Sequence, residues 1–158
     1  MAFKPVTFTL NGTSRAAFTE DGQNLLEFLR RANGDLSPKF GCGQGACGAC
    51  TVEIDGVTQL SCMVLAESVQ GKVVKTAAGL ADGARLHPLQ EAFMERFAAQ
   101  CGFCTPGMLL SAKALLDRNP RPSRDEVIEA ISGNLCRCTG YEPIIEAILD
   151  VAEGRVRA

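Results

Sequence analysis

Eight cysteines in two separate sets of four constrain this chain more than any other feature of its 158 residues. Disulfides are rare in reducing compartments, where cysteine clusters more often hold metal or do redox chemistry. Each set has the number of thiolates that one four-thiolate site takes. The pattern therefore predicts two metal sites. The first set is Cys42, Cys47, Cys50 and Cys62, and the second is Cys101, Cys104, Cys136 and Cys138.

Composition argues against several classes of partner. The 16 Lys and Arg residues nearly balance the 18 Asp and Glu residues, and no basic cluster stands out, which disfavours nucleic acid or an anionic membrane surface. The apolar runs fall far short of the ~20 residues that a membrane-spanning helix needs. The first ten residues, MAFKPVTFTL, lack the apolar segment of a secretory signal. We therefore expect a cytoplasmic protein without a membrane span.

The first half has the patterns of strands and one short helix. Apolar residues alternate with threonines before Asn11-Gly12, which is a strong hairpin signal, and Asp55-Gly56 marks a second hairpin. Four glycines within 40–50 are incompatible with a regular element. The predicted elements are a hairpin from 6–10 to 15–18, a helix over 24–31, a loop over 40–50, a hairpin over 51–54 and 57–60, and a strand at 73–74.

The second half has the patterns of four helices with short connections. Leu86, Leu89, Phe93 and Phe97 lie at helical spacing, which predicts a first helix that ends near Gln100. The lone histidine, His87, is assigned to the start of this helix rather than to a catalytic pair. The signals for the other three helices are an N-cap at Thr105 before Pro106, a capping box of Ser123 with Glu126, and an apolar stripe over 144–152.

A domain boundary is predicted between the halves. Residues 76–85 are small and polar and carry no apolar stripe, and no strand pattern follows them. The expected domains are therefore 1–77, with one cysteine set, and 78–158, with the other. The fold class is α+β, with a sheet-containing domain followed by a four-helix bundle.

The first cysteine set has the spacing of a plant-type 2Fe-2S ferredoxin, C-x4-C-x2-C followed by a later cysteine. It begins in the stretch FGCGQGACGAC. Glycines there let the backbone turn tightly and direct N–H groups at cluster sulfurs, because no Cβ blocks the approach. Zinc motifs generally bring two C-x2-C pairs, so the spacing favours a 2Fe-2S cluster over the alternatives of structural zinc or disulfides.

The second set, C-x2-C and a later C-x-C, is less specific by spacing. A C-x2-C pair is also typical of zinc sites and of thioredoxin-like redox pairs. One pair lies between the first and second predicted helices and the other between the third and fourth. Both pairs can therefore meet at one end of a bundle. This placement favours a second iron-sulfur cluster and leaves zinc open.

Three blocks of the sequence resemble a known family. GCGQGACGACTV, QCGFCTPGML and GNLCRCTGY, in this order and at this separation, are similar to the small iron-sulfur subunit of the molybdenum hydroxylases, the xanthine oxidase family. The resemblance covers almost the whole chain, and all eight cysteines match its ligand positions. It implies an N-terminal β-grasp domain like plant ferredoxin with one 2Fe-2S cluster, and a four-helix domain with a second.

The resemblance also implies large partner subunits. One carries a molybdopterin cofactor, at which substrate reacts, and another commonly carries FAD or is replaced by a different electron acceptor. In this family the C-terminal cluster lies near the pterin, and the N-terminal one lies toward the acceptor. Gln100 and Cys138 match positions that contact the pterin. We therefore expect an electron-transfer subunit of a multi-subunit oxidoreductase, with no catalytic residues and no substrate site of its own.

Other residues have competing interpretations. Phe103, between two cysteines, either shields a cluster from water or packs in a core, and Arg137 either offsets cluster charge, meets a partner or is solvated. The chain has no G-x-S-x-G or P-loop match, so we assign no nucleophile and no nucleotide site.

Two other functions fit the cysteines alone, a zinc-stabilised interaction module and a free-standing ferredoxin-type carrier. Visible colour distinguishes iron-sulfur clusters from zinc, which is colourless. The helical half argues against the carrier, because a soluble shuttle needs only the first domain.

Overall fold

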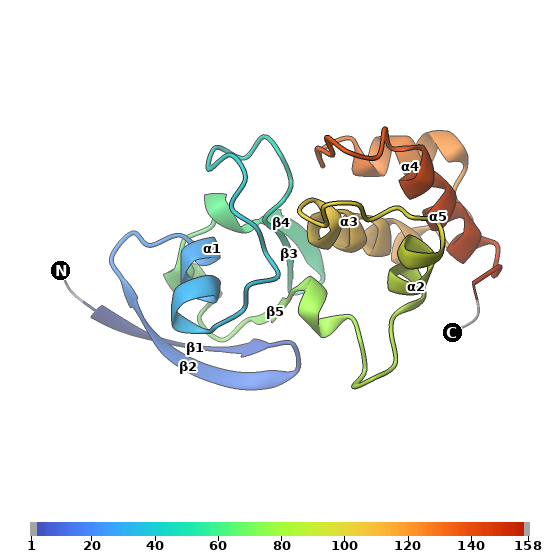
Figure 1. Ribbon diagram of the computed structural model, residues 1–158. Helices are drawn as coiled ribbons and strands as arrows, with labels where there is room; N and C mark the ends of the chain where they lie inside the picture. Colours follow the sequence, from blue (N-terminus) through green and yellow to red (C-terminus); the bar gives the residue numbers. More distant parts are fainter. Residues whose placement is uncertain (1–2, 157–158) are drawn as a thin grey trace.

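The first half of the chain forms a mixed five-stranded sheet, which Figure 1 shows beside the helices of the second half. The computed structural model describes residues 3–156. The strand order is β2-β1-β5-β3-β4, in which the central β5 runs parallel to β1 and antiparallel to β3. The predicted hairpins and the strand at 73–74 are confirmed. The strands are β1 (Phe3–Leu10), β2 (Thr13–Glu20), β3 (Thr51–Ile54), β4 (Val57–Leu60) and β5 (Val73–Lys75).

The two hairpins turn at the dipeptides that the sequence indicates. Asn11 and Gly12 have φ angles of 50° and 79°, and Asp55 and Gly56 have φ angles of 49° and 84°. Positive φ at both central residues is the mark of the turn whose twist matches that of antiparallel strands. The turns therefore fix the register of β1 with β2 and of β3 with β4.

One short helix packs against the sheet. Helix α1 (Leu25–Glu27) continues as a π-helical segment over Phe28–Ala32, and the side chain of Asn24 caps it by accepting the N–H of Glu27 at 2.9 Å. Phe28 is fully buried, and its ring centroid lies 5.6 Å from that of Phe8 on β1. The predicted helix over 24–31 is thus confirmed and forms part of the core of the sheet half.

Four helices make up the second half, so the chain is α+β. They share one apolar core that includes Phe93, Met108, Val127 and Ile148. Helix α3 packs both on the neighbouring helices and on β3, so it joins the two halves (Figure 1). Within residues 3–156, no helix is long and apolar enough to cross a membrane. The helices are α2 (Pro88–Glu95), α3 (Thr105–Arg118), α4 (Arg124–Ile131) and α5 (Glu142–Ala152).

Two predicted helix ends are wrong by a few residues. Helix α2 ends at Glu95 and not near Gln100, because Phe97 takes a left-handed φ of 53°. The Phe97 side chain is 80% exposed and does not continue the apolar stripe. Helix α3 has Cys104 as its N-cap and Thr105 as its first residue, so Thr105 does not act as the cap.

The predicted place of His87 at a helix start and the predicted capping box of Ser123 with Glu126 are confirmed. His87 precedes α2, and its Nδ1 accepts the N–H of Leu89 at 3.2 Å. Ser123 and Glu126 form the capping box of α4, in which each side chain bonds the backbone N–H of the other residue. These caps satisfy backbone donors that have no partner inside a helix.

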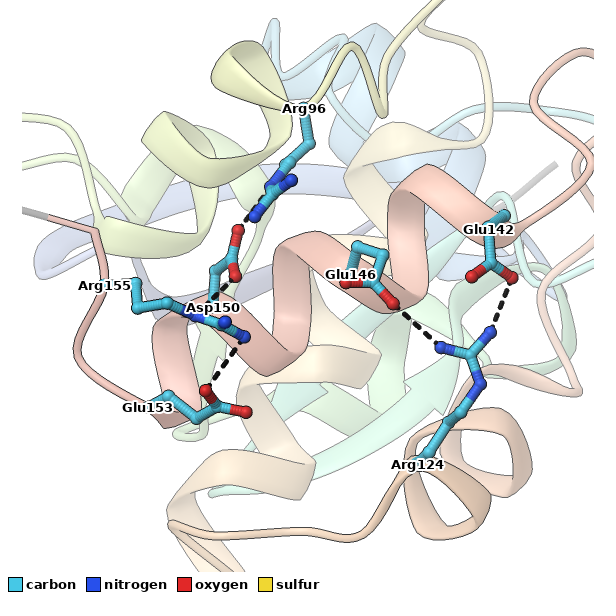
Figure 2. A network of polar contacts seen from close by, with 7 residues as sticks. All are labelled: Arg96, Arg124, Glu142, Glu146, Asp150, Glu153 and Arg155. Atoms are coloured by element: carbon cyan, nitrogen blue, oxygen red, sulfur yellow. Dashed lines mark hydrogen bonds and ion pairs between the residues drawn. The ribbon is translucent and has the colours of Figure 1, made fainter.

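Two ion-pair networks surround α5 (Figure 2). The buried carboxylate of Asp150 pairs with Arg96, at the end of α2, and with Arg155 at 2.8 Å. Farther along α5, Arg124 from α4 reaches Glu142 at 2.5 Å and Glu146 at 2.9 Å, and all three side chains are exposed. The first network joins α5 to the segment that leads toward Cys101.

The connection between the halves begins as part of the sheet half. Thr76 is fully buried, its N–H donates to Asn11 Oδ1 at 2.9 Å, and its hydroxyl donates to Asp35 Oδ2 at 2.6 Å. Residues 82–85 are exposed. The segment is thus anchored at its start by Thr76 and exposed over much of the rest.

Candidate iron-sulfur centres

The first cysteine loop is shaped by glycines, as its sequence predicts. Gly45 has φ of 78°, a conformation that side chains rarely adopt. A β-carbon built on Gly41 would lie 2.7 Å from Cys47 Sγ, so only glycine fits there without a shift. The N–H of Ala46 is directed at Cys42 Sγ at 3.3 Å. This loop therefore wraps closely around its thiols and points a backbone donor at one of them.

The four thiols of the first site lie in two pairs. Cys42 is in hydrogen-bond contact with Cys47, and Cys50 with Cys62. Cys62 sits in a short 3-10 turn, whose Ser61 donates its hydroxyl to the carbonyl of Cys50 at 2.7 Å. The turn after β4 thus brings the fourth cysteine, distant in sequence, back to the loop.

The second site repeats this arrangement at the helix ends. Cys101 and Cys138 have their sulfurs 3.5 Å apart, and Cys104 contacts Cys136. Each contact joins the α2–α3 connection to the α4–α5 connection. The expectation that the two cysteine pairs of the second half meet at one end is therefore confirmed.

Paired thiols fit a 2Fe-2S cluster. Such a cluster takes four thiolates shared between two irons, so two pairs per site match its needs. Among residues 3–156, no three His, Cys, Asp or Glu side chains are grouped closely enough to hold a single metal ion. The chemistry of the donor set is likewise suitable, because thiolates are the ligands of these clusters.

The thiols differ in their acidity. The backbone N–H groups of Gln44 and Ala46 lower the pKa of Cys42 to about 7. Burial raises the pKa of Cys50 to about 11 and that of Cys104 to about 12. A metal ligand must be the thiolate, so the buried pair members would lose their protons on coordination rather than before it.

Exposure separates the two ends of the second site. Cys104 is buried, whereas Cys101, Cys138 and Gln100 are exposed. Arg137 is exposed too. The candidate pterin-contact residues therefore face outward together with one thiol pair of this site.

Phe103 links the surroundings of the two sites. It is 47% exposed, and its ring lies 3.8 Å from a β-carbon built on Gly41 in the first loop. The alternative of core packing is thus wrong for Phe103. Its ring lies beside Gly41 of the first loop.

No sequence pattern assigns a role to Asn134 or Gly107. The Tyr141 hydroxyl accepts the N–H of Cys136 at 2.9 Å, and the Thr139 hydroxyl donates to Cys136 Sγ at 3.1 Å. Asn134 is buried beside Gly48. Three of these residues stand in the quoted block GNLCRCTGY, which was the available signal, but no metal-ligand chemistry singles them out.

Comparisons with known proteins agree with this geometry. Residues 8–79 match the 2Fe-2S iron-sulfur cluster binding domain family, and residues 76–149 match the [2Fe-2S] binding domain family. Over 147 residues the chain is 49% identical to the nicotine 6-hydroxylase small subunit of Paenarthrobacter nicotinovorans, covering 93% of this chain and 88% of that one. The chain belongs to the small iron-sulfur subunits of the molybdenum hydroxylase family.

Solved structures and longer relatives extend the likeness of this small subunit. It superposes on a chain of quinoline 2-oxidoreductase from Pseudomonas putida 86 with a TM-score of 0.94 and 47% identity, covering 98% of this chain and 96% of that one. Aldehyde oxidoreductase of Megalodesulfovibrio gigas is 42% identical over 91% of this chain, which matches only 16% of that longer protein. The same unit thus occurs both as a separate subunit and as part of a larger chain.

Proposed function

We propose that the small subunit passes electrons from a molybdopterin centre in a large partner subunit, through two 2Fe-2S clusters, to FAD or another acceptor. The proposed ligands are Cys42, Cys47, Cys50 and Cys62 for the first cluster and Cys101, Cys104, Cys136 and Cys138 for the second. Bound clusters supply the one-electron acceptors. The chain holds each cluster by two thiol pairs and keeps the two sites next to one another.

One hydrogen bond carries most of this proposal. The N–H of Leu135 donates to the carbonyl oxygen of Cys47 at 2.9 Å, and Leu135 directly precedes Cys136. A ligand residue of one site is therefore joined to a ligand residue of the other through a single peptide and a single hydrogen bond. Two successive electron carriers need such contact, whereas two independent structural zinc sites do not need it.

The order of transfer follows from which thiols face outward. Gln100, Cys101 and Cys138 are exposed, and we propose that Gln100 and Cys138 contact the pterin when the large subunit covers them. Electrons then enter at the second cluster and leave from the first. A large partner is supported by aldehyde oxidoreductase of Megalodesulfovibrio gigas, in which the matching unit is a small part of a longer chain.

The remaining parts of the proposal concern organisation. We propose that residues 1–77 form a β-grasp domain like plant ferredoxin and that residues 78–158 form a four-helix bundle. A separate FAD-bearing or other acceptor subunit completes the electron path. The thiol-rich composition supports a reducing, cytoplasmic location. The zinc-stabilised module and the free-standing carrier are not favoured by the relatives.

Metal analysis and paired variants test this function. Iron and acid-labile sulfide should be equal, at twice the content of a single-cluster ferredoxin. In the dithionite-reduced complex, paramagnetic resonance should resolve two cluster signals. Cys47→Ser should remove or alter one signal only, and Cys104→Ser the other only. Zinc as the dominant metal, or loss of the same signal in both variants, would refute the proposal.

A further inference from the structure

The two cysteine-bearing regions touch at Gly48, the residue that follows Cys47. The carbonyl oxygen of Gly48 accepts a hydrogen bond from Asn134 Nδ2 at 3.1 Å, besides one from the Thr51 hydroxyl. Asn134 is only 4% exposed and lies two residues before Cys136. A buried amide from the second site therefore holds a peptide group of the first loop.

A neighbouring side chain orients this amide. The hydroxyl of Ser111, on α3, donates to Asn134 Oδ1 at 2.7 Å. With its oxygen engaged by Ser111, the amide presents its nitrogen to Gly48, so both ends of the side chain are satisfied. The arrangement fixes one orientation of Asn134 between α3 and the first loop.

Two glycines let the backbones approach this closely. Gly107, in the first turn of α3 and three residues after Cys104, has no room for a side chain, because a β-carbon built there would overlap the carbonyl oxygen of Gly48. A β-carbon built on Gly48 would lie 2.5 Å from both Asn134 Nδ2 and the carbonyl oxygen of Gly133. A side chain at Gly107 therefore forces α3 away from the first loop, and a side chain at Gly48 forces the loop away from the α4–α5 connection.

We propose that Gly48, Gly107, Ser111 and Asn134 form a positioning junction that sets the distance and orientation between the two clusters. This inference rests on the proposed function. Three of the four residues lie within three positions of a proposed ligand, so a shift of the junction moves the ligands themselves. The Leu135-to-Cys47 hydrogen bond lies in the same contact and would lengthen with it.

Gly107→Ala in the assembled complex tests the junction directly. The reduced clusters are both paramagnetic, so their mutual splitting reports their separation and orientation. We expect Gly107→Ala to keep full iron and sulfide but to lose or change this splitting, and to slow transfer from the second cluster to the first after rapid mixing with dithionite. Asn134→Ala, which adds no bulk, should produce a change in the same measurements.

Two control variants separate positioning from general packing. Gly133→Ala adds the same methyl group beside Asn134, but a β-carbon built there meets nothing within 4 Å and its φ is ordinary. Lys113→Gln breaks another contact between the halves, the 3.4 Å ion pair with Glu53 on β3. Both should retain the wild-type splitting and transfer rate.

The outcomes are decisive in each direction. Wild-type splitting and transfer in cluster-loaded Gly107→Ala and Asn134→Ala would overturn the junction. Failure of both variants to take up clusters would overturn it too, because the residues would then be needed for folding rather than for geometry. If Gly107→Ala alone fails to take up clusters, the splitting and transfer rate of Asn134→Ala decide whether the junction positions the clusters. A wild-type protein without two cluster signals would reject the proposed function instead, before any variant is compared.

Discussion

Substitution of Asp150 by Asn should destabilise the small subunit far more than the same kind of change at the neighbouring surface network. The Asp150 side chain is 6% exposed and pairs with Arg96 and Arg155, which are 46% and 51% exposed (Figure 2). Glu146, 38% exposed, pairs with Arg124, which is 42% exposed. The two networks therefore differ in the burial of their carboxylate.

The expected magnitude lies between two known limits. Removing one partner of a fully buried ion pair costs about 3–5 kcal/mol, whereas an exposed pair contributes about 0–1 kcal/mol. Asp150 is buried, but water screens its two arginines, so we place Asp150→Asn between these limits at about 2 kcal/mol. For a chain of this size that is a fall of about 4–8 °C in the unfolding midpoint.

Thermal unfolding of the cluster-loaded subunit at one fixed scan rate is the assay, with Glu146→Gln as the matched control. The control should lie close to wild type and should respond more to added salt, because exposed pairs are screened. Asp150→Asn should also loosen the Cys101 region, since Arg96 ends the helix that leads there. Equal midpoints for the two variants would refute the reasoning from burial.

Two further predictions concern helix caps. Burial lowers the pKa of His87 from its ordinary 6.5, and its Nδ1 must stay unprotonated to accept the N–H of Leu89. As the pH falls, the unfolded chain therefore takes up a proton before the folded chain does, so the free energy of unfolding should decrease below about pH 6.5. His87→Asn removes the only histidine of the chain. It should flatten the plot of unfolding free energy against pH between about pH 5.5 and 7.5. An unchanged slope would contradict the assignment. Ser123→Ala should cost about 1 kcal/mol in a urea titration, while Ser132→Ala, past the end of the same helix, serves as control and should cost less.

The local elements were predictable from sequence because their signals are local. Hairpins at Asn11-Gly12 and Asp55-Gly56, and the capping box at Ser123, each depend on a few adjacent residues. The end of α2 was not predictable, because the apolar spacing continues to Phe97, where the backbone is already left-handed.

The cysteine sites were likewise predictable only in part. Spacing grouped the thiols into two sets, but it could not show that Cys101 contacts Cys138 rather than the nearby Cys104, since that depends on how two helix connections meet. Gly107 and Asn134 stayed without a role for the same reason. Their function as close-contact residues exists only once a segment far away in the chain is placed beside them.

The buried start of the connection between the halves has a consequence for the kinetics of the enzyme. Because Thr76 is bonded to both Asn11 and Asp35, the segment cannot act as a free hinge, and α3 lies directly on β3. The two electron sites are then parts of one fixed body. Transfer between them needs no conformational gate, so its rate should be independent of solvent viscosity, and any viscosity-sensitive step of turnover belongs to a partner subunit.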